Sequence, residues 1–319
     1  MEVVVQATVP RNNAVVRSAA LTVGANYVDL AAEVGDPFGP SDEWRSRGLV
    51  GLVGMGGDPG LSNLMARRSA DGMDRVESIR VRDADTVSSP DYPFLTLSSP
   101  EAFIDRVLRP SRIWEGGKYR EVAPFGEPET YTFPVPVGAR KVYSVSHEEV
   151  ETLPKYIGKD LEYVDFKRAL DDSTVRILQM LKELNLLEAG TPESPGPLKV
   201  VIGALPKPGE LAGRVEGQTT LVVETTGEAG GLRRQETLYT SLSHPKAHEL
   251  YHTTATSYLT GTPAAVAVEL VAAGKIRERG LLPPEALDPA RFFAKLRERG
   301  IVVTERRTIE RDLGGGRSP

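Results

Sequence analysis

The 319-residue chain contains no cysteine. It can therefore form no disulfide, bind no metal through a thiolate and use no thiol as a nucleophile. Aromatic residues make up only 6% of the chain, and there are four histidines. The net charge is −5 with no basic stripe, so nucleic-acid binding is not expected.

Long apolar runs are also missing. The most apolar helical stretch, residues 263–273, is short and carries Glu269, so no membrane span is expected. The first residues lack the basic and apolar regions of a signal peptide. With 40% hydrophobic and 26% charged residues, the composition is that of a soluble globular protein. Its length suggests two domains, and we expect a cytoplasmic protein that binds no membrane.

The first 75 residues alternate between strand and helix patterns. Three short apolar runs are typical of strands, and two amphipathic segments between and after them are typical of helices. The expected strands are 3–7, 27–30 and 49–53, and the expected helices are 10–24 and 62–70. The first strand, rich in valine, reads as buried on both faces. Strand and helix in alternation predict a parallel βα arrangement.

A glycine-rich loop follows the third expected strand. Residues 54–63 read GMGGDPGLSN, which nearly matches the dinucleotide fingerprint G-x-G-x-x-G but has Pro59 in the sixth position. The loop lies at the carboxyl edge of the sheet, where ligands bind. A tight turn without a ligand explains the pattern equally well. Asp29 and Asp58 follow strands at this edge, and each could orient a substrate hydroxyl or amine or simply cap a helix.

The remainder of the chain has a different texture. Prolines between residues 90 and 136 punctuate short extended pieces, which is typical of an α+β or mostly antiparallel region. The later expected elements are a helix at 172–187, a hairpin at 219–225 and 234–240, a helix from Pro263 to Gly274, a helix at 288–300, a strand at 301–304 and a disordered tail from about residue 314.

Two histidine patterns are candidates for chemistry. His248 and His252 complete the zinc-binding pattern H-E-x-x-H. The pattern is short, no third ligand is well placed, and threonines follow it, so we predict no metal site. His147 lies in a polar segment near 144–149. It could carry a proton near neutral pH, or it could be an ordinary exposed loop histidine.

Several sequence segments together resemble the saccharopine dehydrogenase-like family. They are GANYVDL at 24–30, GDPGLSN at 57–63, ETLP at 151–154, ATSYLTGTPAA at 255–265, LPPEAL at 282–287 and residues 292–300. The order of these segments is more specific than any one of them, and the resemblance runs from Val3 to about Glu305. The lysine 6-dehydrogenase branch is the most similar, through SPE at 99–101 and WEGGK at 114–118.

The resemblance implies an α/β fold with a partial Rossmann-like parallel sheet and a larger α+β substrate and dimerisation domain. The implied divisions are 1–75, the second half of a dinucleotide-binding domain; 76–250, the substrate and dimerisation domain; and 251–319, helices and a strand that return toward the Rossmann part. The implied function is an NAD- or NADP-dependent oxidoreductase. It would act on the C–N bond of an amino acid or its imine adduct, of lysine or saccharopine type, as a homodimer.

The resemblance also implies roles for individual residues. The expected cofactor contacts are Val9, Pro10, Asp29, Leu30, Gly57, Pro59 and Gly60. The expected substrate contacts are Ala31, Ala32 and Asn63. The expected catalytic residues are Asp58, which matches an aspartate that contacts the substrate amine, and His147.

The resemblance fails at one place. The family's glycine-rich first turn, and the residue that selects NAD or NADP, would belong to a preceding half of the Rossmann domain. We therefore expect an amino-terminal truncation, through a misassigned start, and weakened cofactor binding. The alternative is a non-catalytic remnant that binds a ligand or dimerises. Residues 81–89 also lack an expected Gly-Gly stretch, which leaves the exact substrate open.

Overall fold

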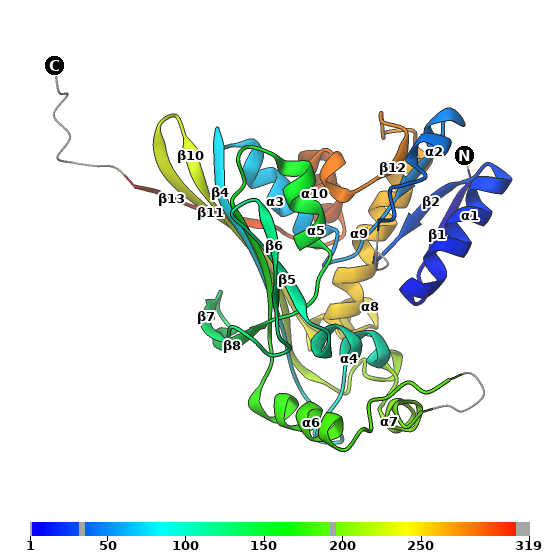
Figure 1. Ribbon diagram of the computed structural model, residues 1–319, viewed down its shortest axis with the longest axis vertical. Coiled ribbons are helices and arrows are strands. Elements are labelled where there is room, and N and C mark those ends of the chain that lie inside the picture. Colours follow the sequence, from blue (N-terminus) through cyan, green and yellow to red (C-terminus); the bar gives the residue numbers. More distant parts are fainter. Residues whose placement is uncertain (1, 32–35, 192–195, 311–319) are drawn as a thin grey trace.

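The computed structural model describes residues 2–31, 36–191 and 196–310. Its strands form a small parallel sheet and a large mixed sheet, which confirms the mixed α/β fold expected from the sequence. In Figure 1 the small sheet lies on the right and the large sheet curves through the middle. Across the described residues, no helix combines the length and apolar character that crossing a bilayer requires.

The small sheet has the strand order β1–β2–β3–β12, and all three pairings are parallel. Its strands are β1 (Val3–Gln6), β2 (Asn26–Asp29), β3 (Val50–Leu52) and β12 (Gly280–Leu282). The last strand comes from the far end of the chain, so the two ends of the sequence fold together. Its carboxyl edge carries the loops that were expected to bind a ligand.

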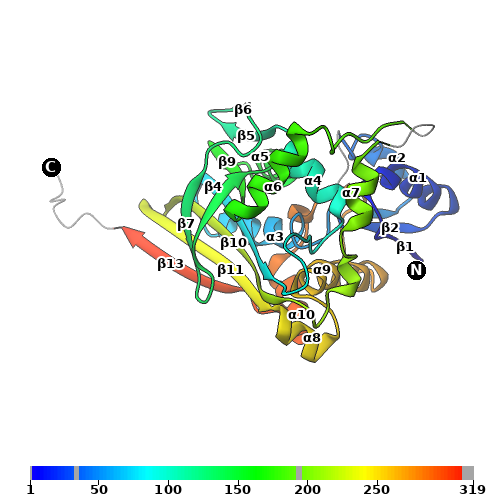
Figure 2. The ribbon, with the colours of Figure 1, turned by 90° about the horizontal axis from the view of Figure 1, so that it is seen from below.

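The large sheet has the main order β13–β11–β10–β4–β9–β5–β6, and β8 also pairs with β9 and β7. Figure 2 shows β13, β11 and β10 side by side. The strands are β4 (Arg75–Ser88), β5 (Ser111–Glu115), β6 (Lys118–Val122), β7 (Glu129–Phe133), β8 (Gly138–Ser144), β9 (Tyr163–Ala169), β10 (Glu216–Ala229), β11 (Leu232–Ser243) and β13 (Thr304–Glu310).

The helices cover these sheets and join them. The α-helices are α1 (Asn13–Val23), α2 (Ser41–Ser46), α3 (Leu61–Asp71), α4 (Pro100–Leu108), α5 (Glu149–Ile157), α6 (Asp172–Glu183), α7 (Leu198–Ala204), α8 (His244–Tyr251), α9 (Ala255–Ala272) and α10 (Pro289–Glu298). The 3₁₀ turns are η1 (Pro10–Asn12), η2 (Pro208–Glu210) and η3 (Pro284–Ala286). Helix α9 touches both β1 and β2 of the small sheet and β10 and β11 of the large one.

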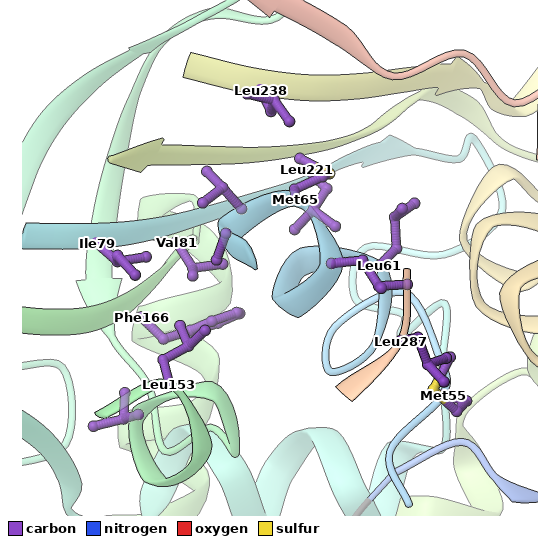
Figure 3. Packing of buried hydrophobic residues seen from close by; sticks show 14 of the residues in the cluster. Met55, Leu61, Met65, Ile79, Val81, Leu153, Phe166, Leu221, Leu238 and Leu287 are labelled. Atoms are coloured by element: carbon purple, nitrogen blue, oxygen red, sulfur yellow. The ribbon is translucent and has the colours of Figure 1, made fainter. Parts of the chain in front are cut away.

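Alternation along the central strands divides the large sheet into two faces. On β4, Ile79 and Val81 belong to the main hydrophobic core, whereas Ala84 belongs to a separate cluster on the opposite face. Helix α3 packs on the first face, and Figure 3 shows Leu61 and Met65 of this helix near Leu221 of β10. Further along the same face the strands become polar, because Asp83 and Asp85 continue the spacing of Ile79 and Val81. One face of the sheet therefore passes from an apolar core to a largely buried charged region.

Three sequence predictions differ from the structure. Strand β1 is not buried on both faces, because it forms one edge of the small sheet and leaves Val5 46% exposed. The helix predicted to start at Pro263 begins eight residues earlier, at Ala255, where the Thr254 side chain caps it by accepting from the Ser257 N–H. The last strand is 304–310 rather than 301–304. The predicted tail from about residue 314 lies outside the described residues.

Candidate functional site

The glycine loop after β3 folds tightly on itself and on the end of β2. Gly56 approaches the carbonyl of Leu30 so closely that a Cβ there would lie 2.6 Å from that oxygen. Gly60 has a φ of +126°, which side chains disfavour, and its N–H donates to the Asn63 side chain at 2.8 Å. These glycines are therefore required by the loop's own packing. The loop delivers Gly57 and Asp58 to the edge of a pocket.

The pocket lies between the two sheets. Its floor is the polar end of the large sheet, and its walls are the glycine loop and helix α9. The lining residues are Gly57, Asp58, Leu61, Asp83, Asp85, Thr219, Leu221, Thr240, Thr256, Leu259 and Thr260. Apart from three leucines and a glycine, these side chains are aspartates and threonines. The cavity is small, about 20 Å³, and the carboxylates around it suit one ligand group that carries positive charge and hydrogen-bond donors, such as a protonated amine.

Three aspartates share one arginine in this pocket. Arg168 of β9 lies opposite Asp83 of β4 in the strand register, and its guanidinium is 2.5 Å from the Asp83 carboxylate. The same guanidinium nitrogen is 3.3 Å from Asp58. Asp85, two residues along β4, accepts a hydrogen bond from the Thr256 hydroxyl at 3.0 Å. The carboxylates therefore outnumber the cation by three to one.

Burial changes the acidity of Asp58 and Asp83. Burial raises the pKa of Asp58 to about 7, although the Arg168 charge opposes the shift. Burial also raises the pKa of Asp83 well above its usual value, again against Arg168. Removing water from around a carboxylate disfavours its charged form, and neighbouring carboxylates disfavour it further. Asp58 can therefore take or release a proton near neutral pH, as a general base or acid does.

His147 lies directly behind Asp58. Its Nε2 atom is 3.7 Å from the Asp58 carboxylate, and its ring stacks on Phe166 with centroids 3.8 Å apart. The side chain is only 1% exposed, so His147 is not the exposed loop histidine of the alternative interpretation. Burial, followed by the charge of Arg106, lowers the pKa of His147 well below its usual value. The two residues proposed as catalytic from the sequence thus lie side by side.

A metal ion is disfavoured beside His147. Ligand atoms of His147, Glu148 and Glu149 lie within 4.8 Å of one another, close enough to share an ion. Arg106 is already there, however, 2.7 Å from His147 Nε2 and 2.7 Å from Glu148. A guanidinium so close supplies the positive charge that an ion would bring. The other histidine pattern is also unlike a zinc site, since His252 ends helix α8 in a left-handed conformation.

The remaining predicted site residues fall into three groups. Asp29 is fully buried, and its carboxylate accepts from the Gly54 N–H at 2.6 Å. Asn63 is also buried and donates to Thr152 and to Glu285. The half-buried residues Val9, Pro10, Leu30 and Ala31 lie at the carboxyl ends of β1 and β2, and Pro59 and Gly60 are buried in the loop. Ala32 lies outside the described residues. The ligand contacts predicted for these positions stay predictions.

Three site residues escaped the sequence analysis, namely Asp83, Asp85 and Arg168. A signal was present for the first two, because residues 80–85 read RVRDAD. Charged residues at alternate positions on both faces of a central strand are unusual, and they mark a place where the sheet is not covered by apolar core. No comparable signal marks Arg168, whose partners come from β4 and from the glycine loop.

The described residues fit one end of a nicotinamide dinucleotide better than the other. The loops after β2 and β3 meet where Met55 N–H donates to the Asp29 carbonyl, and they lead to the Asp58 pocket, as the ring end of a dinucleotide requires. The turn after β1, residues 7–10, contains no glycine. It therefore lacks the G-x-G-x-x-G cradle that holds a pyrophosphate.

Comparison with protein families identifies the chain. Residues 56–301 match the family model of the saccharopine dehydrogenase C-terminal domain. The chain belongs to the saccharopine dehydrogenase family. The match begins in the glycine loop and ends just before β13, so it contains every residue of the pocket. This membership confirms the resemblance inferred from the ordered sequence segments.

Curated relatives are similar over most of the chain. Carboxyaminopropylagmatine dehydrogenase of Synechocystis is 26% identical over 94% of this chain and 78% of its own length. Carboxynorspermidine synthase of Vibrio alginolyticus is 27% identical over 83% of this chain. The chain spans 64% of that relative's length.

Two solved structures share the fold. Homospermidine synthase of Legionella pneumophila, determined with NAD, has a TM-score of 0.71 at 15% identity and covers 96% of this chain and 76% of its own. Saccharopine dehydrogenase (L-Glu forming) of Saccharomyces cerevisiae has a TM-score of 0.64 at 14% identity, over 96% of this chain and 85% of its own. At these identities the likeness concerns the fold alone.

Proposed function

We propose that the chain is an oxidoreductase that uses NAD or NADP to oxidise or form the C–N bond of an amine. The observation that carries the proposal is the pocket in which Asp58, Asp83 and Asp85 face a single Arg168. Surplus carboxylates attract a protonated amine, and threonine hydroxyls around them can bind its N–H groups. Membership of the saccharopine dehydrogenase family supports the redox part of the proposal.

The substrate we favour is an adduct of a polyamine with a carboxylic or amino acid. Both curated relatives described above carry polyamine names, carboxyaminopropylagmatine and carboxynorspermidine. The lysine or saccharopine type expected from the sequence has no comparable support among them. Several positive charges in the ligand would also match several carboxylates in the pocket. Arg168 would limit how many amines the pocket accepts, because it neutralises part of the negative charge.

The chain's own residues supply acid–base chemistry and orientation. The nicotinamide ring, when bound, accepts or donates the hydride. Asp58, with a pKa of about 7, takes the proton from the substrate ammonium so that the nitrogen lone pair can form the imine. In the reverse direction the protonated Asp58 returns that proton to the nitrogen. Asp83 and Asp85 hold the cationic part of the substrate, and Arg168 keeps Asp58 and Asp83 together.

Turnover of defined adducts tests the proposal. We would follow NADH and NADPH absorbance with carboxyaminopropylagmatine, carboxynorspermidine and saccharopine. We expect oxidation of a polyamine adduct, a loss of at least about tenfold in kcat/KM in Asp58→Asn, and no change in the control Asp91→Asn, whose carboxylate forms an exposed pair with Arg214. Amine binding without absorbance change for any substrate would instead support the non-catalytic remnant. Absence of both binding and turnover would contradict both readings.

We also propose that the chain forms a homodimer. It is inferred from the family resemblance, and sedimentation of the full chain tests it directly.

A further inference from the structure

A buried chain of polar groups continues inward from His147, away from the pocket. His147 Nδ1 lies 2.5 Å from the Glu149 carboxylate. The other oxygen of Glu149 accepts from the Ser62 hydroxyl at 2.6 Å. Ser62 neighbours Asn63, which donates to Glu285. Glu149 itself is fully buried, at the start of α5 behind the wall of the pocket.

The contacts of His147 fix which of its nitrogens carries the proton. Arg106 is 2.7 Å from Nε2, and a guanidinium can only donate hydrogen bonds. Nε2 must therefore be the accepting nitrogen, and the proton of the neutral ring must be on Nδ1. From there it is donated to Glu149. Stacking on Phe166, with planes 8° apart, fixes the plane of the ring.

Glu149 has no cation in contact to balance its charge among the described residues. Its recorded side-chain partners are the Ser62 hydroxyl and the His147 ring, while Arg106 pairs with Glu148 and Arg168 with Asp83. Burial raises the pKa of Glu149 to about 7. A carboxylate buried in this way costs stability, and such costs are typical of functional sites.

The geometry points to Glu149 as a positioning residue that holds the His147 ring so that Nε2 accepts from Arg106 and keeps this guanidinium beside Asp58. This role rests on the proposed function, because the charge of Arg106 opposes the rise in the pKa of Asp58, the proposed general base. The groups around His147 are Asp58, Arg106, Glu148, Glu149 and Arg168. By accepting from the Nδ1–H, Glu149 orients the ring, as a second carboxylate orients a catalytic histidine.

Nuclear magnetic resonance of the full chain tests the assignment without any substrate. Long-range ¹H–¹⁵N correlation distinguishes the two neutral tautomers, and the chain has only four histidines, so His147→Asn assigns the signal. At neutral pH we expect the Nδ1–H tautomer for His147. An Nε2–H tautomer or an imidazolium would overturn the inference. The tautomer is read on the unmutated protein, and the His147→Asn variant serves only to assign the signal.

Kinetics of two variants then separate positioning from structure. Glu149→Met removes the nearer acceptor of the Nδ1–H, and we expect kcat to fall about 10- to 100-fold with its pH profile shifted upward, as for other residues that orient a catalytic group. Glu149→Gln keeps an acceptor oxygen and should recover part of kcat and the original pH profile. The control Glu151→Met alters an exposed residue of the same helix that pairs with Arg112.

The outcomes also separate this inference from the proposed function. An unchanged kcat and pH profile in a folded Glu149→Met would overturn the positioning role. The expected tautomer in a chain that turns over no amine would contradict the proposed function and still support the His147–Glu149 assignment.

Discussion

Two charged clusters lie back to back on the large sheet, and they are built from neighbouring residues of the same two strands. On one face Arg82 and Lys167 meet Asp165 and Glu129. On the other face, one residue along each strand, Asp83 meets Arg168. We refer to these as the balanced cluster and the pocket cluster. Alternation along β4 and β9 places them on opposite faces, since successive side chains of a strand point in opposite directions.

The balanced cluster has as many cations as carboxylates. Arg82 forms two parallel hydrogen bonds with Asp165, at 2.7 and 2.9 Å, and both side chains are 1% exposed. Although burial opposes it, the charge of Arg82 lowers the pKa of Glu129 on balance. Each charge therefore has a partner, and this cluster needs no ligand. The pocket cluster adds Asp58 and Asp85 to a single arginine, and two of its carboxyl groups have raised pKa values. Both clusters are buried, so the property that distinguishes the structural cluster from the binding site is the ratio of cations to carboxylates.

The largest expected effect is on the balanced cluster. Arg82→Met leaves Asp165 buried without its partner, and we expect the free energy of unfolding to fall by about 3–5 kcal/mol. Chemical denaturation measures it. A fall below about 1 kcal/mol, on the scale of an exposed ion pair, would show that the cluster is not the structural element described.

The next effect is on the pocket cluster and has the opposite sign for stability. Asp85→Asn removes a carboxylate that has no cation in contact among the described residues, and its amide oxygen can still accept from Thr256. We therefore expect unfolding at pH 8 to require more denaturant, while binding of a polyamine weakens at least about tenfold. Calorimetric titration with spermidine measures the second change. A variant that is less stable and binds as before would place Asp85 in the same class as Asp165.

The buried carboxyl groups also make the stability of the protein depend on pH, which is a smaller effect. Asp58 and Glu149 have folded-state pKa values of about 7, against usual values of 3.8 and 4.5. Between about pH 4 and pH 7 these two carboxyl groups are deprotonated in the unfolded chain but still protonated in the folded chain. Their contribution to the free energy of unfolding therefore falls as the pH rises through this range. Asp58→Asn should flatten this slope. Denaturation curves at a series of pH values measure it, and an unchanged slope would contradict the raised pKa.

The smallest expected effect concerns an ion pair at the surface. Asp91 and Arg214 are both about half exposed, so Asp91→Asn should change neither the denaturation midpoint nor amine binding measurably. A clear change in binding would show that net charge alone, and not the pocket carboxylates, attracts the ligand.

The sequence predicted the parts of the fold that depend on local pattern. The βα alternation, the hairpin of β10 and β11 and the loop containing Asp58 are visible as apolar runs separated by glycine and proline, and they are present in the structure. Asp58 and His147 were recognised as candidates separately, and nothing in the sequence indicated that they touch. Their contact depends on α5 lying against α3, which is a matter of tertiary packing.

The pocket cluster was missed for a related reason. Asp83 and Arg168 are 85 residues apart, and their pairing requires the parallel register of β4 with β9. The sequence around an aspartate in a strand does not show whether the folded protein places a cation next to its carboxylate. The start of α9 was misplaced because Pro263 is usual in the first turn of a helix, whereas here it lies inside one. In that case a local rule was outweighed by the Thr254 cap and the burial of the helix.

Proton release on ligand binding tests the central claim most directly. Calorimetric titration of the full chain with spermidine at pH 7, repeated in buffers of different ionisation enthalpy, counts the protons exchanged. A cation placed in the pocket lowers the raised pKa values of Asp58 and Asp83, so we predict net proton release, up to about half a proton from Asp58 alone. Binding with no proton exchange, or with proton uptake, would contradict the claim that surplus carboxylates form the amine site.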